Sequence, residues 1–316
     1  MLICVLAALE GPPSGSEGIR IAQYANEQPD VTFFNGLSAA IERSFVDPAP
    51  NFYRFNTDDA QWTAPAGSYL VNERGWDNMV VVSEDYSSPY AQVFGDMGPF
   101  CAVWGKVSEN HIVPLGSKEY SSVIALLPMS GGDVDGIFMV LGGSEAVNFL
   151  TQCAQLGEDL PIVGGSITVD QTALTAEGPV SDNDDLPARQ EFFAKSQAFF
   201  GDEGLPSPSL FAFNDYVSTK AALLGLQEVN GDLSDPEADR AALDTLSFET
   251  PTGTVAINEN LQATTSFNIN EVVEGEDSHL KNEPLARVEG IDQYPGLGKE
   301  AFTALGLPSC GNPSCE

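Results

Sequence analysis

The stretch NMVVVSEDYSSPYAQVFGDMGPFCAVWG, residues 78–105, predicts a strand, a small polar loop and a helix, in that order. The β-branched run at 80–82 is typical of a buried strand, and Ser88-Pro89 follows where a helix would begin. The same unit recurs downstream as HIVPL before YSSVIALLP, as DGIFMVLGG before SEAVNFLTQCAQLG, and as the final LPIVGG. Strands that alternate with helices indicate an α/β fold with parallel sheets flanked by helices.

The helix predicted over SEAVNFLTQCAQLG shows its buried face most clearly. Its apolar residues recur at helical spacing, at Ala146, Phe149, Leu150, Cys153 and Leu156. Ser144 is placed to cap this helix. The stripe predicts packing against a core rather than a cofactor site.

The two ends of the chain extend this pattern. VTFFNG with the polar 37–39 segment predicts a strand and loop of a second α/β lobe. The acidic, Pro- and Gly-punctuated 175–190 segment is expected where the chain passes between lobes. Helices are predicted over PARQEFFAKSQAFF and NDYVSTKAALLGLQEV, then turn, strand, turn and strand over 250–275. The Gly- and Pro-rich stretch from Glu274 is expected to wrap the surface.

The charge of the chain is strongly negative, with 46 acidic against 13 basic residues and a net charge of −33. Such a charge disfavours nucleic acid and anionic membrane surfaces as partners, so no nucleic acid partner is expected. The acids are scattered without the spacing of an EF-hand loop, which favours a solvated acidic surface over a dedicated cation-binding role. No apolar run reaches the roughly 18 residues needed to span a membrane, so no membrane insertion is expected.

The opening MLICVLAAL is apolar, but no basic residue precedes it and no small-residue cleavage site follows. It therefore predicts a buried strand rather than a signal peptide. We expect an upstream segment to be absent, together with any export signal that it carried.

Motifs for chemistry are weak. The two histidines, His111 and His279, lack ligand-spaced partners and the five cysteines form no C-x-x-C pair, so no metal is expected. GGSEA and GGSIT lack the last glycine of a nucleophile elbow, GLGKEA follows no strand, and no phosphate-binding P-loop is present. Adjacent acids such as Glu84-Asp85 and Asp58-Asp59 are expected by chance in so acidic a chain. We predict no enzyme activity and no cofactor.

Taken in order, nine segments resemble the branched-chain amino-acid-binding (Leu/Ile/Val-binding) family of extracytoplasmic solute receptors that feed ABC importers. Each segment is weak alone and their order is specific. They are GPPSGSEG, NFYRFNTDDAQW, RGWDNMVVVSEDYSSPY, VPLGSKEYSSVIALLP, VDGIFMVLGGSEAVNFLTQ, LPIVGGSITVDQTAL, PSPSLFAFNDYVSTKAALLGL, TPTGTVAINENLQA and the terminal NPSC.

The resemblance implies a two-lobed type I periplasmic binding fold whose lobes close on a small molecule, with hinges near Asp58, Gly178 and Asn258. The lobes are then 1–57 (N-lobe), 58–178 (C-lobe), 179–258 (N-lobe, return) and 259–316 (C-lobe and tail). Members begin with roughly two more βα units before GPPSGSEG, so the N-lobe is expected to be truncated. The chain also looks shortened between Leu174 and Thr175, which leaves the second crossover less defined.

In the N-lobe, the resemblance assigns a ligand carboxylate to two loops. These are Ser14 with Gly15 or Ser16, in EGPPSGSEGIRIAQYA (residues 10–25), and Ser38 with Ala39. The free N–H groups and the dipole at a helix N-terminus favour an anion, which agrees with this assignment. From the residues alone, a plain helix cap at Ser14 stays an alternative.

In the C-lobe, candidate residues follow the strands, where ligands bind in open α/β sheets. They are Tyr86, Ser88, Gly142 and Ser166, with Asp170 as the acid nearest to Ser166. A partly buried loop aromatic is the alternative for Tyr86. Ser166 stands where Leu/Ile/Val receptors carry an ammonium-binding glutamate. Because serine cannot neutralise an ammonium group, an amide, a carboxylic acid or an aromatic acid is an alternative to an α-amino acid.

The function implied is a periplasmic or extracytoplasmic monomer that delivers a small carboxylate- or amide-bearing ligand to the permease subunits of an ABC importer. A ligand-sensing domain of a signalling system and a hydrolase are the alternatives. The family-like contexts PFCAVWG and NPSC also imply a disulfide bond between Cys101 and Cys315, with Cys153 and Cys310 as a second pair. Cysteine spacing alone does not fix this connectivity.

Overall fold

The computed structural model of the chain describes residues 14–46, 48–128, 130–165, 167–168, 186–201, 208–274, 280–311 and 315. The chain divides into two units. Unit 1 comprises Met1–Asp58, Asn183–Asn268 and Arg287–Gln293, and unit 2 comprises Asp59–Asp182, Ile269–Ala286 and Tyr294–Glu316. The lobe boundaries drawn from the resemblance stay a prediction, and the opening strand and the hinge near Gly178 lie outside the described residues.

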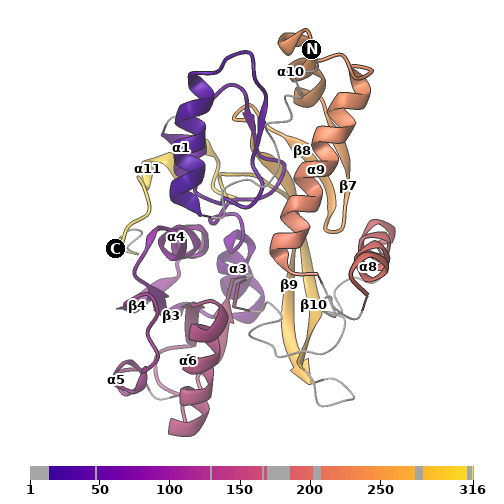
Figure 1. Cartoon of the computed structure of the whole chain (residues 1–316). Coiled ribbons are helices and arrows are strands. Elements are labelled where there is room, and N and C mark those ends of the chain that lie inside the picture. Colours follow the sequence, from indigo (N-terminus) through magenta and orange to yellow (C-terminus); the bar gives the residue numbers. More distant parts are fainter. Residues whose placement is uncertain are drawn as a thin grey trace. The chain divides into compact units, whose positions relative to one another are not determined.

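Unit 2 is built on a parallel sheet, as the sequence predicted (Figure 1). Its strands have the order β4-β3-β5-β6, where β3 is Asn78–Glu84, β4 is Lys106–Val113, β5 is Gly136–Val140 and β6 is Ile162–Gly164. All seven residues of β3 are buried, which requires cover on both faces of the sheet.

Helices supply that cover, since alternate residues of β3 point to opposite faces. Val80 and Val82 pack with α5 (Ser121–Ile124) and α6 (Gly143–Leu156). Met79 and Val81 pack with α4 (Ser87–Ala102) and with the turn η1 (Leu70–Arg74) that continues α3 (Ala64–Tyr69). The carboxyl ends of β3 and β5 are therefore held rigidly at one edge of the sheet.

Helix α6 differs from its prediction at both ends. Its N-cap is Gly142, and the Ser144 hydroxyl donates to the Glu145 carboxylate at 2.8 Å, so the predicted Ser144 cap is wrong. Leu156 is exposed because the helix ends at Gly157, whose left-handed φ of 78° turns the chain away. The buried stripe is real over its first part, where Ala146, Phe149 and Cys153 face the sheet.

Unit 1 begins with α1 (Gly15–Asn26), β1 (Phe33–Phe34), α2 (Glu42–Phe45) and β2 (Phe52–Tyr53), and β1 pairs in parallel with β2. A second sheet has the order β10-β9-β8-β7, with β7 at Ser247–Thr250, β8 at Gly253–Ile257, β9 at Ala263–Glu274 and β10 at Leu280–Ile291. The β7–β8 and β8–β9 pairs are antiparallel. Residues 269–274 of β9 and 280–286 of β10 belong to unit 2.

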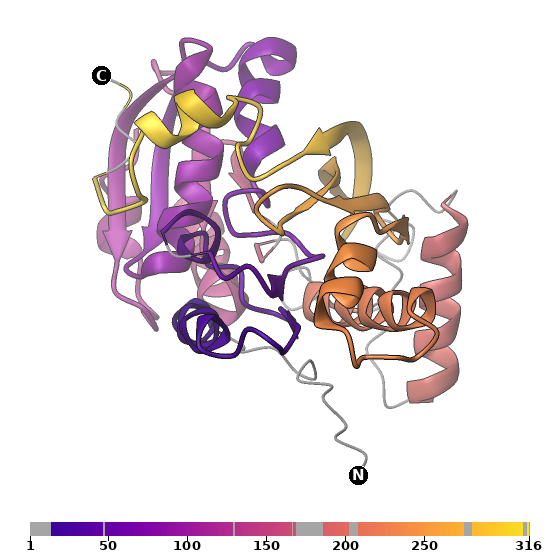
Figure 2. The same ribbon diagram turned by 90° about the horizontal axis from the view of Figure 1, so that it is seen from above.

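The helices predicted in this part of the chain are present as α8 (Pro187–Phe200) and α9 (Leu210–Glu228), followed by α10 (Pro236–Asp244). Helix α8 lies beside α9, where the rings of Phe192 and Tyr216 are 4.7 Å apart (Figure 2). Val217 and Ala221 of α9 pack on Tyr53 of β2, which gives unit 1 its core.

The stretch from Glu274 was expected to wrap the surface, and this expectation is wrong for residues 280–291. They form β10, because pairing with β9 satisfies their backbone groups despite the helix- and strand-breaking composition around them. A short helix, α11 (Lys299–Ala304), follows and buries Phe302 against Phe94 of α4.

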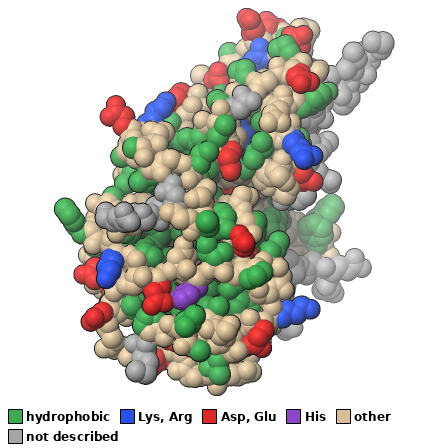
Figure 3. Space-filling model, turned by 90° about the vertical axis from the view of Figure 1, so that its left-hand side faces the viewer, with side chains coloured by type: hydrophobic (Ala, Val, Ile, Leu, Met, Phe, Trp, Pro, Cys, Tyr) green, Lys and Arg blue, Asp and Glu red, His purple; other side chains and the backbone are tan. Residues whose placement is uncertain are grey.

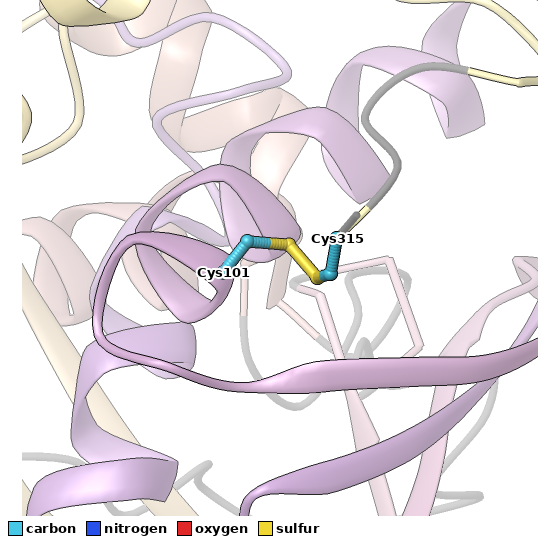
Figure 4. The surroundings of a disulfide bond; sticks show 2 residues. All are labelled: Cys101 and Cys315. Atoms are coloured by element: carbon cyan, nitrogen blue, oxygen red, sulfur yellow. A yellow bond between two sulfur atoms is a disulfide. The ribbon is translucent and has the colours of Figure 1, made fainter.

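A disulfide bond joins Cys101, at the end of α4, to Cys315, with their Cα atoms 5.2 Å apart (Figure 4). This is the pairing expected from the family-like contexts of the two residues. The second predicted pair is wrong, because Cys153 and Cys310 are free thiols. Cys153 is buried in the face of α6 that packs on the sheet, whereas Cys310 is exposed.

Candidate functional site

In unit 1, Ser14 is the N-cap of α1. Its hydroxyl accepts from the Glu17 amide at 3.4 Å, and the Glu17 carboxylate accepts from the Ser14 amide at 3.3 Å. This reciprocal pair is a capping box, so the cap alternative left open by the sequence is observed. The Ser16 hydroxyl lies 3.2 Å from that of Ser14, and both side chains are exposed or partly exposed. The role of Ser14, Gly15 and Ser16 toward a ligand stays a prediction.

The start of α1 packs tightly on the loop between β1 and α2, which we name the 36–41 loop. A Cβ atom on Gly15 would lie 3.1 Å from the Cβ of Ala40, so only a residue without a side chain allows this approach without a shift. The fold therefore brings the predicted Ser14–Ser16 group next to the predicted Ser38 and Ala39, although more than 20 residues separate them in the chain.

Alternate carbonyl groups of the 36–41 loop are held by buried side chains of unit 1. The carbonyl of Gly36 accepts from Asn56, that of Ser38 from Asn35 at 2.7 Å, and that of Ala40 from Arg54 at 2.8 Å. In a trans peptide the C=O and the following N–H point in opposite directions. The N–H groups of Leu37, Ala39 and Ile41 are thus turned away from these donors.

The outward-turned N–H groups of the 36–41 loop are hydrogen-bond donors without an acceptor among the described residues. Within the described residues, no hydrogen bond links the amides of Leu37, Ala39 and Ile41 to any acceptor. The Ser38 hydroxyl is buried, at 1% exposure, and likewise has no partner among the described residues. Buried donors are rarely left unpaired, because each costs the full desolvation penalty. A row of backbone N–H groups with a hydroxyl can bind a carboxylate.

Arg54 binds the carbonyl side of the 36–41 loop. Its guanidinium is fully buried, forms an ion pair with Asp58 at 3.4 Å and donates to the side chain of Gln262, which lies 208 residues further along the chain. Neither Arg54 nor its asparagine neighbours were singled out from the sequence. The sequence signal that could have identified them is the position of these polar residues directly beside the apolar β1 and β2 segments, because buried polar side chains are almost always hydrogen-bonded to a specific partner.

In unit 2, Tyr86 and Ser88 follow β3 at the carboxyl edge of the sheet. The Ser88 hydroxyl donates to the Asp59 carboxylate at 2.6 Å and accepts from the Gln92 side-chain amide at 3.4 Å. The Gln92 side chain is fully buried, and its carbonyl oxygen has no partner among the described residues. Sequence reasoning missed Gln92, although its spacing of four from Ser88 places the two on one helix face.

Carboxyl groups surround Tyr86. Burial raises the pKa of Glu84 to about 7, and the Glu145 carboxylate adds to that rise. Burial also raises the pKa of Tyr86 to about 12, helped by the charges of Glu84, Asp59 and Glu145. Because this pKa lies far above 7, the Tyr86 hydroxyl stays protonated at neutral pH, and since the residue is 36% exposed the hydroxyl can donate a hydrogen bond.

Gly142, another predicted residue, lies at the same edge of unit 2. Gly142 follows β5 as the N-cap of α6, and a Cβ atom there would lie 3.3 Å from the Ile167 side chain. A Cβ atom on Gly165, after β6, would lie 2.6 Å from the unpaired Gln92 oxygen. Ser166 and Asp170 lie outside the described residues.

Acidic side chains are spread over the face shown in Figure 3 rather than gathered in one place. The described residues contain no group of three or more His, Cys, Asp or Glu side chains arranged to hold a metal ion. None of the helices in the described ranges has the length and apolar character needed to cross a membrane.

A family model described as "Periplasmic binding protein" matches residues 6–277. No curated protein sequence matches the chain. Among solved structures, an ABC transporter substrate-binding protein from Sphaerobacter thermophilus is similar, with a TM-score of 0.80 and 18% identity over 91% of this chain and 80% of that one.

Two further solved structures are similar to the chain. A solute-binding protein of an ABC transporter from R. palustris, in complex with benzoate, has a TM-score of 0.69 and 20% identity over 86% of this chain and 75% of that one. A leucine-, isoleucine-, valine-, threonine- and alanine-binding protein from Brucella ovis has a TM-score of 0.74 and 12% identity over 90% and 78%. At these identities the likeness establishes the fold.

Proposed function

Because the chain belongs to the periplasmic binding protein family, whose model matches residues 6–277, we propose that it is a solute-binding receptor for an ABC importer. Its ligand is a small molecule with one carboxylate. The observation that carries this proposal is the 36–41 loop, where the buried Ser38 hydroxyl and the outward-turned amide of Ala39 have no partner among the described residues.

The carboxylate of the ligand accepts hydrogen bonds from the Ser38 hydroxyl and from the free amides of the 36–41 loop. The N-terminus of α1, packed on that loop through Gly15, adds the positive end of a helix dipole. Each hydrogen bond to a charged group contributes about 1.5–3 kcal/mol, so a few such bonds suffice for micromolar affinity.

Unit 2 offers groups of the opposite character. Asp59 and the unpaired oxygen of Gln92 are acceptors, and the acid-rich surroundings of Tyr86 repel a second carboxylate. We infer that the ligand also carries a hydrogen-bond donor, either the ammonium group of an apolar α-amino acid or the hydroxyl of an aromatic acid. The Brucella protein is named for the amino acids that it binds, and the R. palustris protein is in complex with an aromatic acid, benzoate.

As a receptor of this kind, the protein acts outside the cytoplasm, as a monomer, with permease subunits as its partners and without catalysis. We propose that unit 1 corresponds to the N-lobe of the receptor and unit 2 to its C-lobe.

The test is isothermal titration with leucine, benzoate and 4-hydroxybenzoate, on the wild-type chain and on Ser38→Ala. We expect at least one acid to bind the wild-type chain, and its affinity to fall about tenfold or more in Ser38→Ala, since one hydrogen bond to a charged group is lost. Ser121→Ala, an exposed serine in unit 2, is the matched control and keeps wild-type affinity. Equal affinity in wild type and Ser38→Ala would remove the 36–41 loop from the site.

A further inference from the structure

Helix α9 packs on Tyr53 of β2 through one buried face, and that face carries a polar side chain without a partner. The residues of the face recur every three or four positions, at Asn214, Val217, Ser218, Ala221 and Gly225. Asn214 is 2% exposed, and its side-chain nitrogen has no hydrogen-bond partner among the described residues. A buried N–H donor without an acceptor carries the full cost of its lost hydration, so a bound molecule that supplies an acceptor removes that cost.

The next residue along this face, Ser218, connects α9 to the 36–41 loop. The Ser218 hydroxyl donates to the Asn35 carbonyl at 2.6 Å. The Asn35 side chain in turn donates to the Ser38 carbonyl at 2.7 Å. Residues four apart on a helix are separated by about 6 Å along its axis. Asn214 therefore lies one turn of α9 away from the contact with Asn35, the residue that precedes the loop.

The direction of α9 places Asn214 on the loop side of that contact. The C-terminal half of α9 packs on α10, where a Cβ atom on Gly225 would lie 2.5 Å from the Leu243 side chain (Figure 1). Helix α10 lies beside the residues that precede β1, since Arg240 donates to the Pro29 carbonyl at 2.8 Å. The C-terminal half of α9 is thus at the amino end of β1. Its N-terminal turns extend past the carboxyl end of β1, where the 36–41 loop begins.

Asn214 adds to the buried donors of the 36–41 loop. The Ser38 hydroxyl and the outward-turned amides of that loop likewise have no acceptor within the described part of the chain. The Asn214 nitrogen contributes two further N–H donors. A carboxylate accepts hydrogen bonds at both oxygens and has no donor, whereas the nitrogen of a primary amide only donates. This set of donors therefore fits both oxygens of a carboxylate better than the NH2 group of an amide.

We propose that Asn214 is a ligand-binding residue that selects an acid over its amide. Its side-chain nitrogen donates to one carboxylate oxygen, while Ser38 and the amides of the 36–41 loop bind the other. This inference rests on the proposed function. An amide ligand places its own NH2 group against that of Asn214, which leaves two donors without an acceptor and weakens binding.

The test uses two matched pairs of probes, leucine with leucinamide and benzoate with benzamide. Asn214→Leu removes the donor at similar size, and Asn214→Asp replaces it with an acceptor. Gln227→Glu, at an exposed position of the same helix, makes the same amide-to-acid change away from the loop. Isothermal titration at a single pH of about 8, well above the usual aspartate pKa, gives both dissociation constants of a pair for each protein. A cooperative thermal melt establishes that each variant folds.

The quantity compared is the amide dissociation constant divided by the acid dissociation constant. We expect this ratio to fall about tenfold in Asn214→Leu, because the acid loses one hydrogen bond that the amide never made. In Asn214→Asp it should fall about a hundredfold, because a carboxylate repels the acid and accepts from the amide. Gln227→Glu should keep the wild-type ratio.

A structural role, in which Asn214 donates to the unpaired side-chain oxygen of Asn35, weakens both probes of a pair together. An unchanged ratio in the Asn214 variants would therefore overturn this inference and leave the proposed function standing. If one of the two variants does not fold, the other decides. Binding of neither acid to the wild-type chain would overturn the proposed function and this inference with it.

Discussion

Asp96 of α4 is a buried carboxyl group whose effect on the free energy of unfolding can be measured directly. Its side chain is fully buried in unit 2, and among the described residues the backbone amide of Gly67 is the group near it that favours the ionised form. Burial raises the pKa of Asp96 well above its ordinary value. The group is therefore protonated in the folded protein at pH values where it is ionised in the unfolded chain.

The sign of the pH dependence follows from the proton count. Below the unfolded-state pKa of about 4, both states hold the proton and Asp96 costs nothing through ionisation. Above it, the unfolded chain releases the proton and the folded protein does not, so stability is lost as the pH rises toward the folded-state pKa. The loss is about 1.4 kcal/mol for each pH unit, which is the free energy of transferring one proton.

Asp96→Asn removes this titration while keeping the size of the side chain. In urea unfolding we expect the variant to gain on the wild-type chain by about 1.4 kcal/mol for each pH unit above the unfolded-state pKa of about 4, until the folded-state pKa of Asp96 is reached. Asp159→Asn, an exposed residue of the same unit, is the control and should show no such slope. A difference between Asp96→Asn and wild type that does not change with pH would show that Asp96 is ionised in the folded protein, and would refute the reasoning.

Two further predictions concern the edge of unit 2 and the disulfide bond. Because the pKa of Glu84 is about 7, its carboxyl group gains a negative charge between pH 6 and pH 8. The affinity for an anionic ligand, measured by titration, should therefore fall about threefold over that range, and by less in Glu84→Gln. Equal pH profiles for the wild-type chain and Glu84→Gln would contradict this prediction. The disulfide bond between Cys101 and Cys315 closes a span of 214 residues, so Cys315→Ser should lower the free energy of unfolding, measured in urea, by about 4 kcal/mol. The control variant Cys310→Ser should leave this free energy unchanged within experimental error. An unchanged urea midpoint in Cys315→Ser would mean that the bond is absent in solution.

Those helices and strands could be predicted whose buried residues recur at a short, regular spacing in the sequence. The β-branched run of β3 and the apolar stripe of α6 record burial at strand and helix spacing, and both elements are present. The ends of α6 were misjudged because Gly142 and Ser144 are both acceptable caps, and the approach of the neighbouring strand decides between them. The strand β10 was missed because its partner β9, rather than its own residues, stabilises it.

The candidate site could be predicted only in part, for the same reason. Ser38 follows β1 of unit 1 and Tyr86 follows β3 of unit 2, and ligands of open α/β sheets bind at the carboxyl ends of strands, so position along the chain indicates each of them. The contacts of Arg54 with Gln262 span 208 residues, and no local pattern reveals them. The sequence also does not indicate which carbonyl groups of the 36–41 loop face inward. This orientation leaves the Ala39 amide without a hydrogen-bond acceptor among the described residues.

The most direct test of the account is a crystal structure of the protein with the tightest-binding acid of the panel. The account predicts a carboxylate oxygen at hydrogen-bond distance, about 3 Å, from both the Ser38 hydroxyl and the Ala39 amide. A carboxylate bound elsewhere, with the Ser38 hydroxyl still unpaired, would contradict it.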